Sequence, residues 1–133
     1  MASRGEKNNN PLNINHGDKW RGLSPVQKDP RFCTFTTSFY GFRAGAIILK
    51  TYRKKYNATT LEDVIKRWSS PLEDDTDAYI QAVSAMAKIG RKESIWQSKE
   101  VFQKVLEGMA VVENGYIKAQ WIEDIKRAVL EVW

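Results

Sequence analysis

Apolar residues recur at intervals of three and four along most of the chain after residue 38, a spacing that places them on one face of an α-helix. The first such stretch begins at about Phe39 and runs to about Tyr56. Its predicted buried face holds Ala44, Ile47, Ile48 and Tyr52. We therefore expect a long amphipathic surface helix that ends near Asn57.

Two shorter helices are predicted next, each with a recognisable start signal. Thr60 is a natural N-cap, and Asp63 follows it three residues later in an arrangement close to a capping box. Asp75 or Thr76 has the same capping role for a helix that Gly90 is expected to close. The apolar residues predicted to be buried in these two helices are Leu61, Val64, Ile65, Trp68, Tyr79, Ile80, Val83 and Met86.

Two further helices complete the predicted set. Residues 98–113 end at the pair Asn114 and Gly115, which favours a left-handed helix terminus. The last helix is expected from about Lys118 to Val132. The residues predicted to face inward from residues 98–113 are Val101, Phe102, Val105, Leu106 and Met109.

The start of the chain has a different character, since it is rich in Asn, Gly and Pro, which favour turns. We expect an irregular but ordered segment that Ile14 and Trp20 tie to the rest. Residues 31–35 alternate in the manner of a short strand. The predicted fold is mainly α: a single helical domain over residues 1–133, with an irregular or β-containing segment, residues 1–29, packed on it.

Composition and charge limit the function classes. Apolar residues make up 42% of the chain and charged residues 28%, which indicates a packed core and excludes a wholly disordered chain. The formal net charge of +5 favours an anionic partner: a nucleic acid, an acidic polymer or a membrane surface. The single cysteine, Cys33, forms no internal disulfide and is interpreted as a buried structural thiol, with a reactive thiol as the alternative.

Targeting signals and cofactor motifs are not apparent. No segment approaches the roughly 20 apolar residues of a membrane span, and the polar start is unlike a signal peptide. We therefore expect a protein made in the cytoplasm that reaches the outside through a release system or within a particle. His16 is the only histidine, and no phosphate-binding glycine motif is present, so neither a metal site nor a cofactor is expected.

Glu113 is the most informative residue for chemistry. It lies at the carboxyl end of a predicted apolar helix, where the helix dipole disfavours a negative charge by up to about 1 kcal/mol. Burial behind the preceding apolar residues would raise the pKa of this carboxyl, as a general acid requires. The alternative is an exposed Glu at a frayed helix end.

Two strings around this position carry a resemblance. Residues 105–115, with Glu113 followed by Asn and Gly, resemble the helix of lytic transglycosylases and goose-type lysozymes, whose catalytic Glu precedes a small residue and Gly. Residues 73–83 resemble the Glu-Thr-x-x-Tyr-Val segment that lies beside that Glu in the same superfamily. Here the Tyr79 segment precedes Glu113, so the resemblance implies a lysozyme-like fold with a permuted chain order.

The N-terminal part contains an Asn-Asn-Asn-Pro-x-Asn-Ile string at residues 8–14, followed by Trp20-x-Gly22 and a Tyr-Gly-x-Arg-Ala string at residues 40–44. In these strings it is similar to a family of phage and prophage proteins often described as virion structural proteins. The same stretch resembles Asn-rich segments of bacterial glucosaminidases, which follow the catalytic Glu. The permutation would therefore bring Glu113 next to the Asn-rich segment.

The resemblance implies a role for each candidate residue. Glu113 would be the general acid, and a second carboxylate would be Asp75, Glu73 or Asp18, although single-acid enzymes of this superfamily manage without one. Thr76 is either a substrate contact or a plain helix N-cap, and Trp20 either stacks on sugar or packs in the core. The residues expected to bind substrate are Asn9, Asn10, Asn13, Trp20, Thr76 and Tyr79. Trp68 shares the two interpretations given for Trp20.

Three functions are consistent with these observations. The first is a phage-type muramidase, endolysin or lytic transglycosylase, which cleaves peptidoglycan and has other virion proteins as further partners. The second is a non-catalytic virion or wall-binding protein of lysozyme-like shape. The third, a basic nucleic-acid-binding protein, rests on charge alone, so no nucleic acid is expected as the partner.

Overall fold

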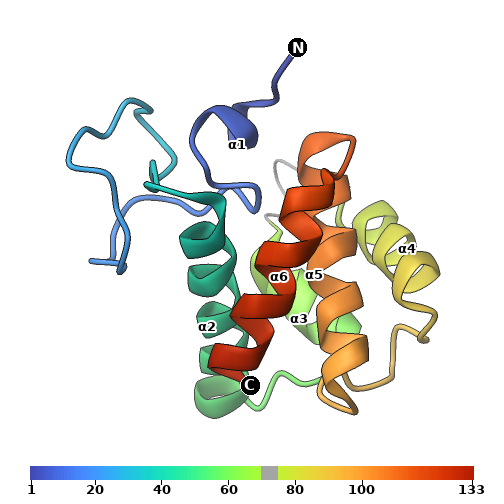
Figure 1. The fold of residues 1–133 in the computed structure, drawn as a ribbon. Coiled ribbons are helices and arrows are strands. Elements are labelled where there is room, and N and C mark those ends of the chain that lie inside the picture. Colours follow the sequence, from blue (N-terminus) through green and yellow to red (C-terminus); the bar gives the residue numbers. More distant parts are fainter. Residues whose placement is uncertain (70–74) are drawn as a thin grey trace.

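The computed structural model describes residues 1–69 and 75–133, and within them the chain forms six helices and no β-strand (Figure 1). The prediction of a mainly α fold is confirmed. Glu73, one of the three candidates for a second carboxylate, lies outside the described residues. The helices are α1 (Arg4–Lys7), α2 (Ser38–Tyr56), α3 (Leu61–Trp68), α4 (Thr76–Ala87), α5 (Lys99–Asn114) and α6 (Ala119–Val132).

The predicted starts of α3 and α4 are confirmed by their capping contacts. The side chain of Thr60 accepts a hydrogen bond from the backbone N–H of Asp63 at 3.2 Å. Asp75, rather than Thr76, caps α4 by accepting from the N–H of Ala78 at 3.0 Å. These side chains satisfy N–H groups that have no partner within the helix.

The end of α4 differs from the prediction. Lys88, with φ of 57°, closes the helix two residues before Gly90, whose N–H donates instead to the Glu93 carboxylate. The expectation that Met86 is buried is also wrong, since its side chain is 38% exposed. The neighbouring Ala87 faces the core in its place.

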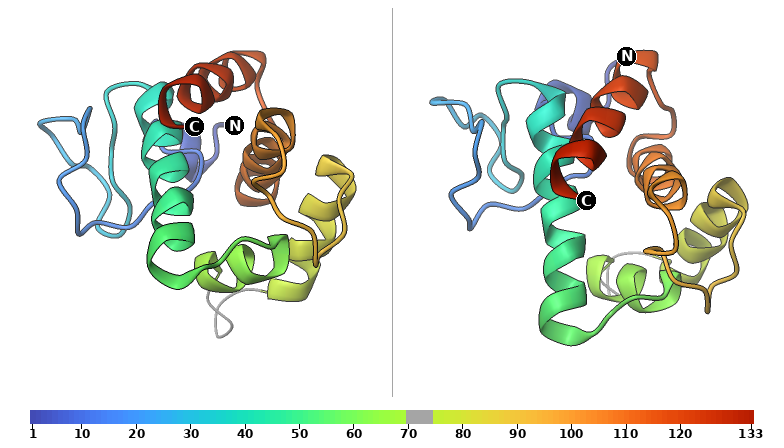
Figure 2. Two further views of the ribbon diagram at one scale, coloured as in Figure 1. Left: turned by 90° about the horizontal axis from the view of Figure 1, so that it is seen from below. Right: turned by 60° about the horizontal axis from the view of Figure 1, so that its bottom comes forward.

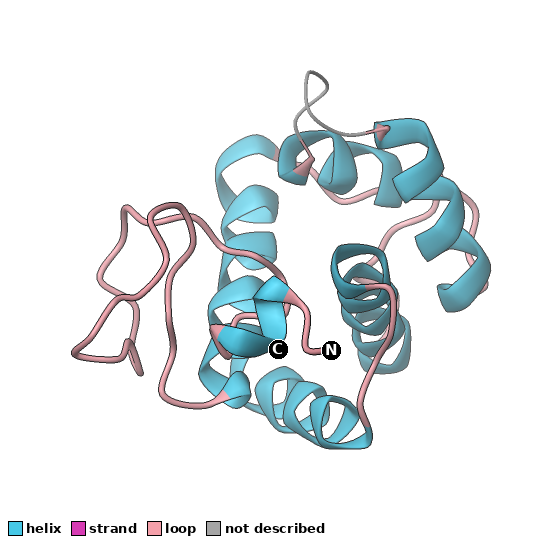
Figure 3. Cartoon of the chain, turned by 90° about the horizontal axis from the view of Figure 1, so that it is seen from above, coloured by secondary structure: helices cyan, strands magenta, loops and turns pink. Residues whose placement is uncertain are grey.

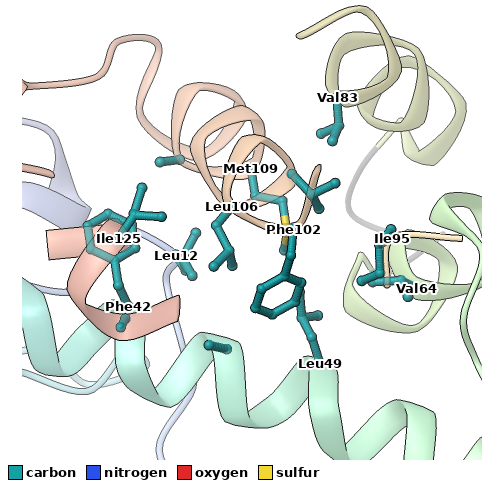
Figure 4. Packing of buried hydrophobic residues seen from close by; sticks show 14 of the residues in the cluster. Leu12, Phe42, Leu49, Val64, Val83, Ile95, Phe102, Leu106, Met109 and Ile125 are labelled. Atoms are coloured by element: carbon teal, nitrogen blue, oxygen red, sulfur yellow. The ribbon is translucent and has the colours of Figure 1, made fainter. Parts of the chain in front are cut away.

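α5 is the central element of the packing. It contacts α4 on one side and α6 on another, while α6 packs along α2 (Figure 2). Figure 4 shows that side chains from these helices meet in one cluster; those labelled include Phe42 and Leu49 of α2, Val83 of α4, Phe102, Leu106 and Met109 of α5, and Ile125 of α6. Each buried side chain of this size contributes about 1.5–3 kcal/mol.

Residues 16–36 lie on the side of α2 away from α4 (Figures 1 and 3), whereas Pro11 and Asn13 contact the end of α5. The expectation of a strand at residues 31–35 is wrong, since only isolated bridges form, between Asn15 and Phe32 and between Leu23 and Phe35. The reason is that the backbone of this stretch bonds to scattered partners rather than to one strand: the N–H of Cys33 donates to Ile14, the N–H of Phe35 donates to Asn8, and a side chain supplies a further bond. Asn10 Nδ2 donates to the carbonyl oxygen of Cys33 at 2.9 Å.

Two further expectations concern Cys33 and membrane spans. Cys33 is 1% exposed, and burial raises the pKa of its thiol, so the interpretation as a structural thiol is supported. None of the helices in the described part of the chain has the length and apolar character needed to cross a bilayer.

Candidate active site at the carboxyl end of α5

Glu113 is the second-last residue of α5 and its side chain is half-buried. Gly115, with φ of 81°, ends the helix, and its N–H donates to the carbonyl of Val111 at 2.7 Å. Glycine adopts the left-handed backbone conformation required here more easily than other residues. The turn directs the chain toward α6 and leaves Glu113 in the last helical turn, beside carbonyl groups that disfavour its ionised form.

Both carboxylate oxygens of Glu113 have defined partners from distant parts of the sequence. Asn13 Nδ2 donates to Oε1 at 2.9 Å, and the Tyr79 hydroxyl donates to Oε2 at 2.9 Å. Tyr79 is 5% exposed and is supplied by the buried face of α4. The structure therefore brings together the Asn-rich segment, the Tyr79 segment and the end of α5.

Asn13 reaches Glu113 because the backbone around it is held in a tight turn. Its N–H donates to the carbonyl of Asn10 at 2.9 Å, and its φ of 54° lies in the left-handed region, which asparagine tolerates better than most residues. Leu12 and Ile14 on either side are buried in the core. With both neighbours pointing inward, the side chain of Asn13 is left to point at α5.

A network of polar contacts holds the first turn of the chain against the connection between α5 and α6. Ser3 Oγ donates to Asn114 Oδ1 at 2.6 Å, and the Glu6 carboxylate accepts from Tyr116 and from Lys118 Nζ, the latter at 2.7 Å. The hydrogen bonds from Lys118 and Tyr116 lower the pKa of Glu6. We call these five residues the terminal clamp. It fixes the N-terminal segment beside Glu113.

Each of the two residues in the contact between Asn13 and Glu113 lines a hollow. The first, of about 220 Å³, is called the Trp68 hollow, and it is lined by Asn13, Ile14, Asn15, His16, Asp18, Ile48, Tyr52 and Trp68. The second, of about 360 Å³, is called the Tyr79 hollow, and it is lined by Asp75, Ala78, Tyr79, Ala82, Val112 and Glu113. Their sizes are near the lower end of small-molecule sites.

The other residues predicted to bind substrate lie elsewhere. Asn10 is fully buried, and its amide donates to the carbonyls of Ile14 and Cys33, which favours the alternative of a self-satisfying turn. Asn9 donates in the same way to the carbonyl of Phe35 at 3.1 Å.

The two remaining candidates line neither hollow. Trp20 packs against the core, and its indole N–H is buried without a partner in the described part. The Thr76 hydroxyl lies 3.3 Å from that of Ser69. Thr76 is the first residue of α4 rather than its N-cap, because Asp75 occupies the capping position.

Sequence reasoning did not single out Tyr52 as a site residue. It was interpreted as part of the buried face of α2, whereas its half-buried ring lines the Trp68 hollow with Trp68 and Asp18. Tyr52 lies one helical turn after Ile48, which also lines the hollow, and this spacing indicates that the two side chains share one face of α2. In the described part of the chain, no group of three or more His, Cys, Asp or Glu side chains is arranged to hold a metal ion.

Comparison with known proteins adds the family. No protein-family model matches the chain. It is similar to Protein P5 of Pseudoalteromonas phage PM2, with 40% identity over 118 residues that cover 86% of this chain and 72% of that protein. This similarity supports the expectation that the chain belongs to a family of phage proteins. The chain belongs to the family of Protein P5 of phage PM2.

Proposed function

We propose that this protein cleaves the glycan strand of peptidoglycan, between N-acetylmuramic acid and N-acetylglucosamine, with Glu113 as the general acid. The observation that carries the proposal is the position of Glu113. Its half-buried carboxyl lines the Tyr79 hollow, with one oxygen bound to Tyr79 and the other to Asn13, which lines the Trp68 hollow. Membership of a phage protein family is consistent with this proposal.

The surroundings of Glu113 suit a group that must carry a proton and release it. Helix carbonyls at the end of α5 and partial burial disfavour the ionised carboxylate, whereas the hydrogen bonds donated by Asn13 and Tyr79 favour it. The Tyr79 hydroxyl donates to the carboxylate and can also accept from the protonated acid, because a phenol is both donor and acceptor. The contact with Tyr79 can therefore persist through a cycle of proton loss and recovery.

In the proposed reaction, Glu113 gives its proton to the glycosidic oxygen as the bond to the anomeric carbon breaks. Either water or the 6-hydroxyl of the same sugar then forms the new bond to that carbon and returns a proton to Glu113. Water gives a hydrolysed end, and the 6-hydroxyl gives an anhydro ring. Asp75 is the described carboxylate that shares the Tyr79 hollow with Glu113, and we assign it the second-carboxylate role if one is used.

Substrate would lie along both hollows, with a sugar ring against Trp68 and Tyr52. Asn13 and Tyr79 would fix the acid in place. We leave Asn9, Asn10, Trp20 and Thr76 out of the substrate contacts, since their side chains serve the backbone, the core or a neighbouring hydroxyl. The protein would act on the wall after release from a lysing cell or from an infecting particle.

The deciding experiment compares the native protein with Glu113→Gln on purified peptidoglycan, measuring turbidity and released muropeptides. Gln keeps the shape and removes the transferable proton. Glu123→Gln, at an exposed position on α6, is the matched control. We expect clearing by the native protein and the control, and none by a folded Glu113→Gln variant.

The other outcomes are equally informative. Activity retained in Glu113→Gln would remove this residue from the mechanism. A native protein that binds peptidoglycan without releasing muropeptides would leave the non-catalytic virion or wall-binding function. The ends of released muropeptides would show whether water or the 6-hydroxyl attacks.

A further inference from the structure

Exposed cations gather where α2 ends beside α3. Arg53, Lys54 and Lys55 lie in the last turn of α2, where positive charge is favourable, and Lys66 and Arg67 lie in the last turn of α3. Lys54 and Lys55 have no carboxylate within ion-pair distance among the described residues. This corner therefore carries positive charge that the described part of the fold does not neutralise.

A third hollow, of about 370 Å³, lies at this corner and is called the Arg67 hollow; it is lined by Tyr56, Ala58, Asp63, Lys66 and Arg67. The Arg67 guanidinium lies 3.6 Å from the centre of the Tyr56 ring, a cation–π contact that holds the guanidinium at the edge of the hollow. Among the described residues that line this hollow, Lys66 and Arg67 are cationic, and Asp63 is the one that carries a carboxylate.

Lys66 is only loosely engaged by its neighbour Glu62. Its Nζ lies 3.5 Å from Glu62, whereas Arg91 and Lys92 bind the same carboxylate at 3.0 and 2.5 Å. Because Glu62 already has two closer cationic partners, Lys66 can turn to a ligand at low cost. The Arg67 hollow is therefore suited to an anion.

The Arg67 hollow continues from the candidate active site through aromatic residues. Tyr52 lines the Trp68 hollow, and its ring centre lies 6.4 Å from that of Tyr56, which lines the Arg67 hollow. Trp68 follows Arg67 directly on α3. A polymer bound at Glu113 and running over Trp68 and Tyr52 would reach Arg67 next.

We propose that the Arg67 hollow is a second subsite, which binds a carboxylate on the stem peptide of the glycan strand held at Glu113. The proposal rests on the proposed function, because it takes the direction of the strand from the active site. A guanidinium binds a carboxylate through two parallel hydrogen bonds, and a lysine adds a point charge. Oligomers of N-acetylglucosamine alone carry no carboxylate and would gain nothing from this subsite.

The test measures binding in the Glu113→Gln background, so that no cleavage interferes. The two probes are soluble peptidoglycan fragments with intact stem peptides and the neutral N-acetylglucosamine hexamer. We expect Lys66→Gln with Arg67→Gln to weaken binding of the peptidoglycan fragments about tenfold and to leave hexamer binding unchanged. Arg67→Lys alone should give an intermediate loss, because it keeps the charge and removes the paired donors.

The matched control is Lys99→Gln with Lys126→Gln, which removes the same charge at exposed positions on α5 and α6 that line none of the three hollows. If the control loses binding of the peptidoglycan fragments to the same extent, the effect comes from overall charge, and the proposal of a subsite is overturned. An equal loss of hexamer binding, or no binding of the peptidoglycan fragments, would overturn it as well.

A single-stranded DNA oligonucleotide is the third probe. Tighter binding of DNA than of peptidoglycan through Lys66 and Arg67 would assign the hollow to nucleic acid and overturn the proposal. Failure of the proposed function remains distinguishable. If cleavage is absent but the charge-dependent preference for peptidoglycan fragments persists, the cleavage function fails and the subsite stands.

Discussion

Asn13 and Glu113, which are 100 residues apart in the sequence, are joined by a hydrogen bond of 2.9 Å from Nδ2 to Oε1. Asn13→Gly removes the amide and makes the positive φ of 54° easy to adopt, whereas Asn13→Ala removes the amide and retains a Cβ atom, without the polar side chain that lets asparagine tolerate this φ. We expect both variants to lose activity on peptidoglycan and Asn13→Ala to be less stable than Asn13→Gly by about 1 kcal/mol. Chemical unfolding measures the difference. Equal stabilities would contradict the strain at this position.

Tyr79→Phe separates the role of the hydroxyl from that of the ring. The ring is buried, so the fold should persist with a stability change of about 1 kcal/mol, the size of a lost hydrogen bond. The cleavage rate should fall about tenfold, because a described contact that orients the Glu113 carboxyl is lost. Initial rates on peptidoglycan and a thermal melt provide both quantities. A variant with the native rate would leave Tyr79 a purely structural role.

Gly41 allows the N-terminal segment to lie directly on α2. A Cβ atom at this position would come within 2.7 Å of the backbone oxygen of Asn9, so Gly41→Ala must push the segment away. We expect a loss of about 1–3 kcal/mol in the free energy of unfolding, larger than the gain of up to about 1 kcal/mol in helix propensity.

The control for Gly41 is Gly90→Ala. The nearest atoms to a Cβ atom at Gly90 belong to the flexible side chain of Glu93, at 3.3 Å, rather than to backbone. Urea unfolding of both variants provides the comparison. A Gly41→Ala protein as stable as the native one would show that the segment does not depend on this close approach.

Acid should weaken the fold through Glu62. The hydrogen bond from Lys92, together with the charges of Lys66 and Arg91, lowers the pKa of Glu62 to about 2, against about 4.3 in an unfolded chain. A carboxylate with a lowered pKa stabilises the fold above its unfolded pKa and loses this contribution as the pH falls through the folded value.

Glu62→Gln should therefore be less stable than the native protein at pH 7, and the difference should shrink between about pH 4.3 and pH 2. Melting temperatures measured across this range test the expectation. Glu123→Gln, at an exposed site, should show a much smaller dependence. A difference for Glu62→Gln that stays constant down to pH 2 would rule out the ion pairs as its cause.

The helices could be predicted because apolar spacing reports directly on burial along a single helix. Leu61 and Ile65, or Phe102 and Leu106, are four residues apart and fully buried. Spacing does not show which group supplies the hydrogen bonds of a non-helical segment. The alternation at residues 31–35 therefore predicts a strand, whereas the backbone of Cys33 bonds to Ile14 and to the side chain of Asn10, and that of Phe35 bonds to Asn8.

The position of Glu113 was informative in the sequence because a negative charge is unfavourable at a helix end. Which asparagine would approach it could not be predicted, since the members of the Asn run carry the same chemical group. Asn8 and Asn10 are buried and bind within the N-terminal segment, and only Asn13 turns to α5. That choice depends on Leu12 and Ile14 packing into the core, which is a property of the assembled fold.

The terminal clamp has a consequence for the stage of folding at which the candidate site can form. Its bonds join residues separated by more than 100 positions, such as Ser3 to Asn114 and Glu6 to Lys118. Contacts between residues so far apart in the sequence require closure of a long loop. The entropy lost in closing this loop slows folding. During synthesis, Asn13 leaves the ribosome long before Glu113 does. The contact between Asn13 and Glu113 can therefore form only after translation has passed α5 and the N-terminal segment has met the end of that helix.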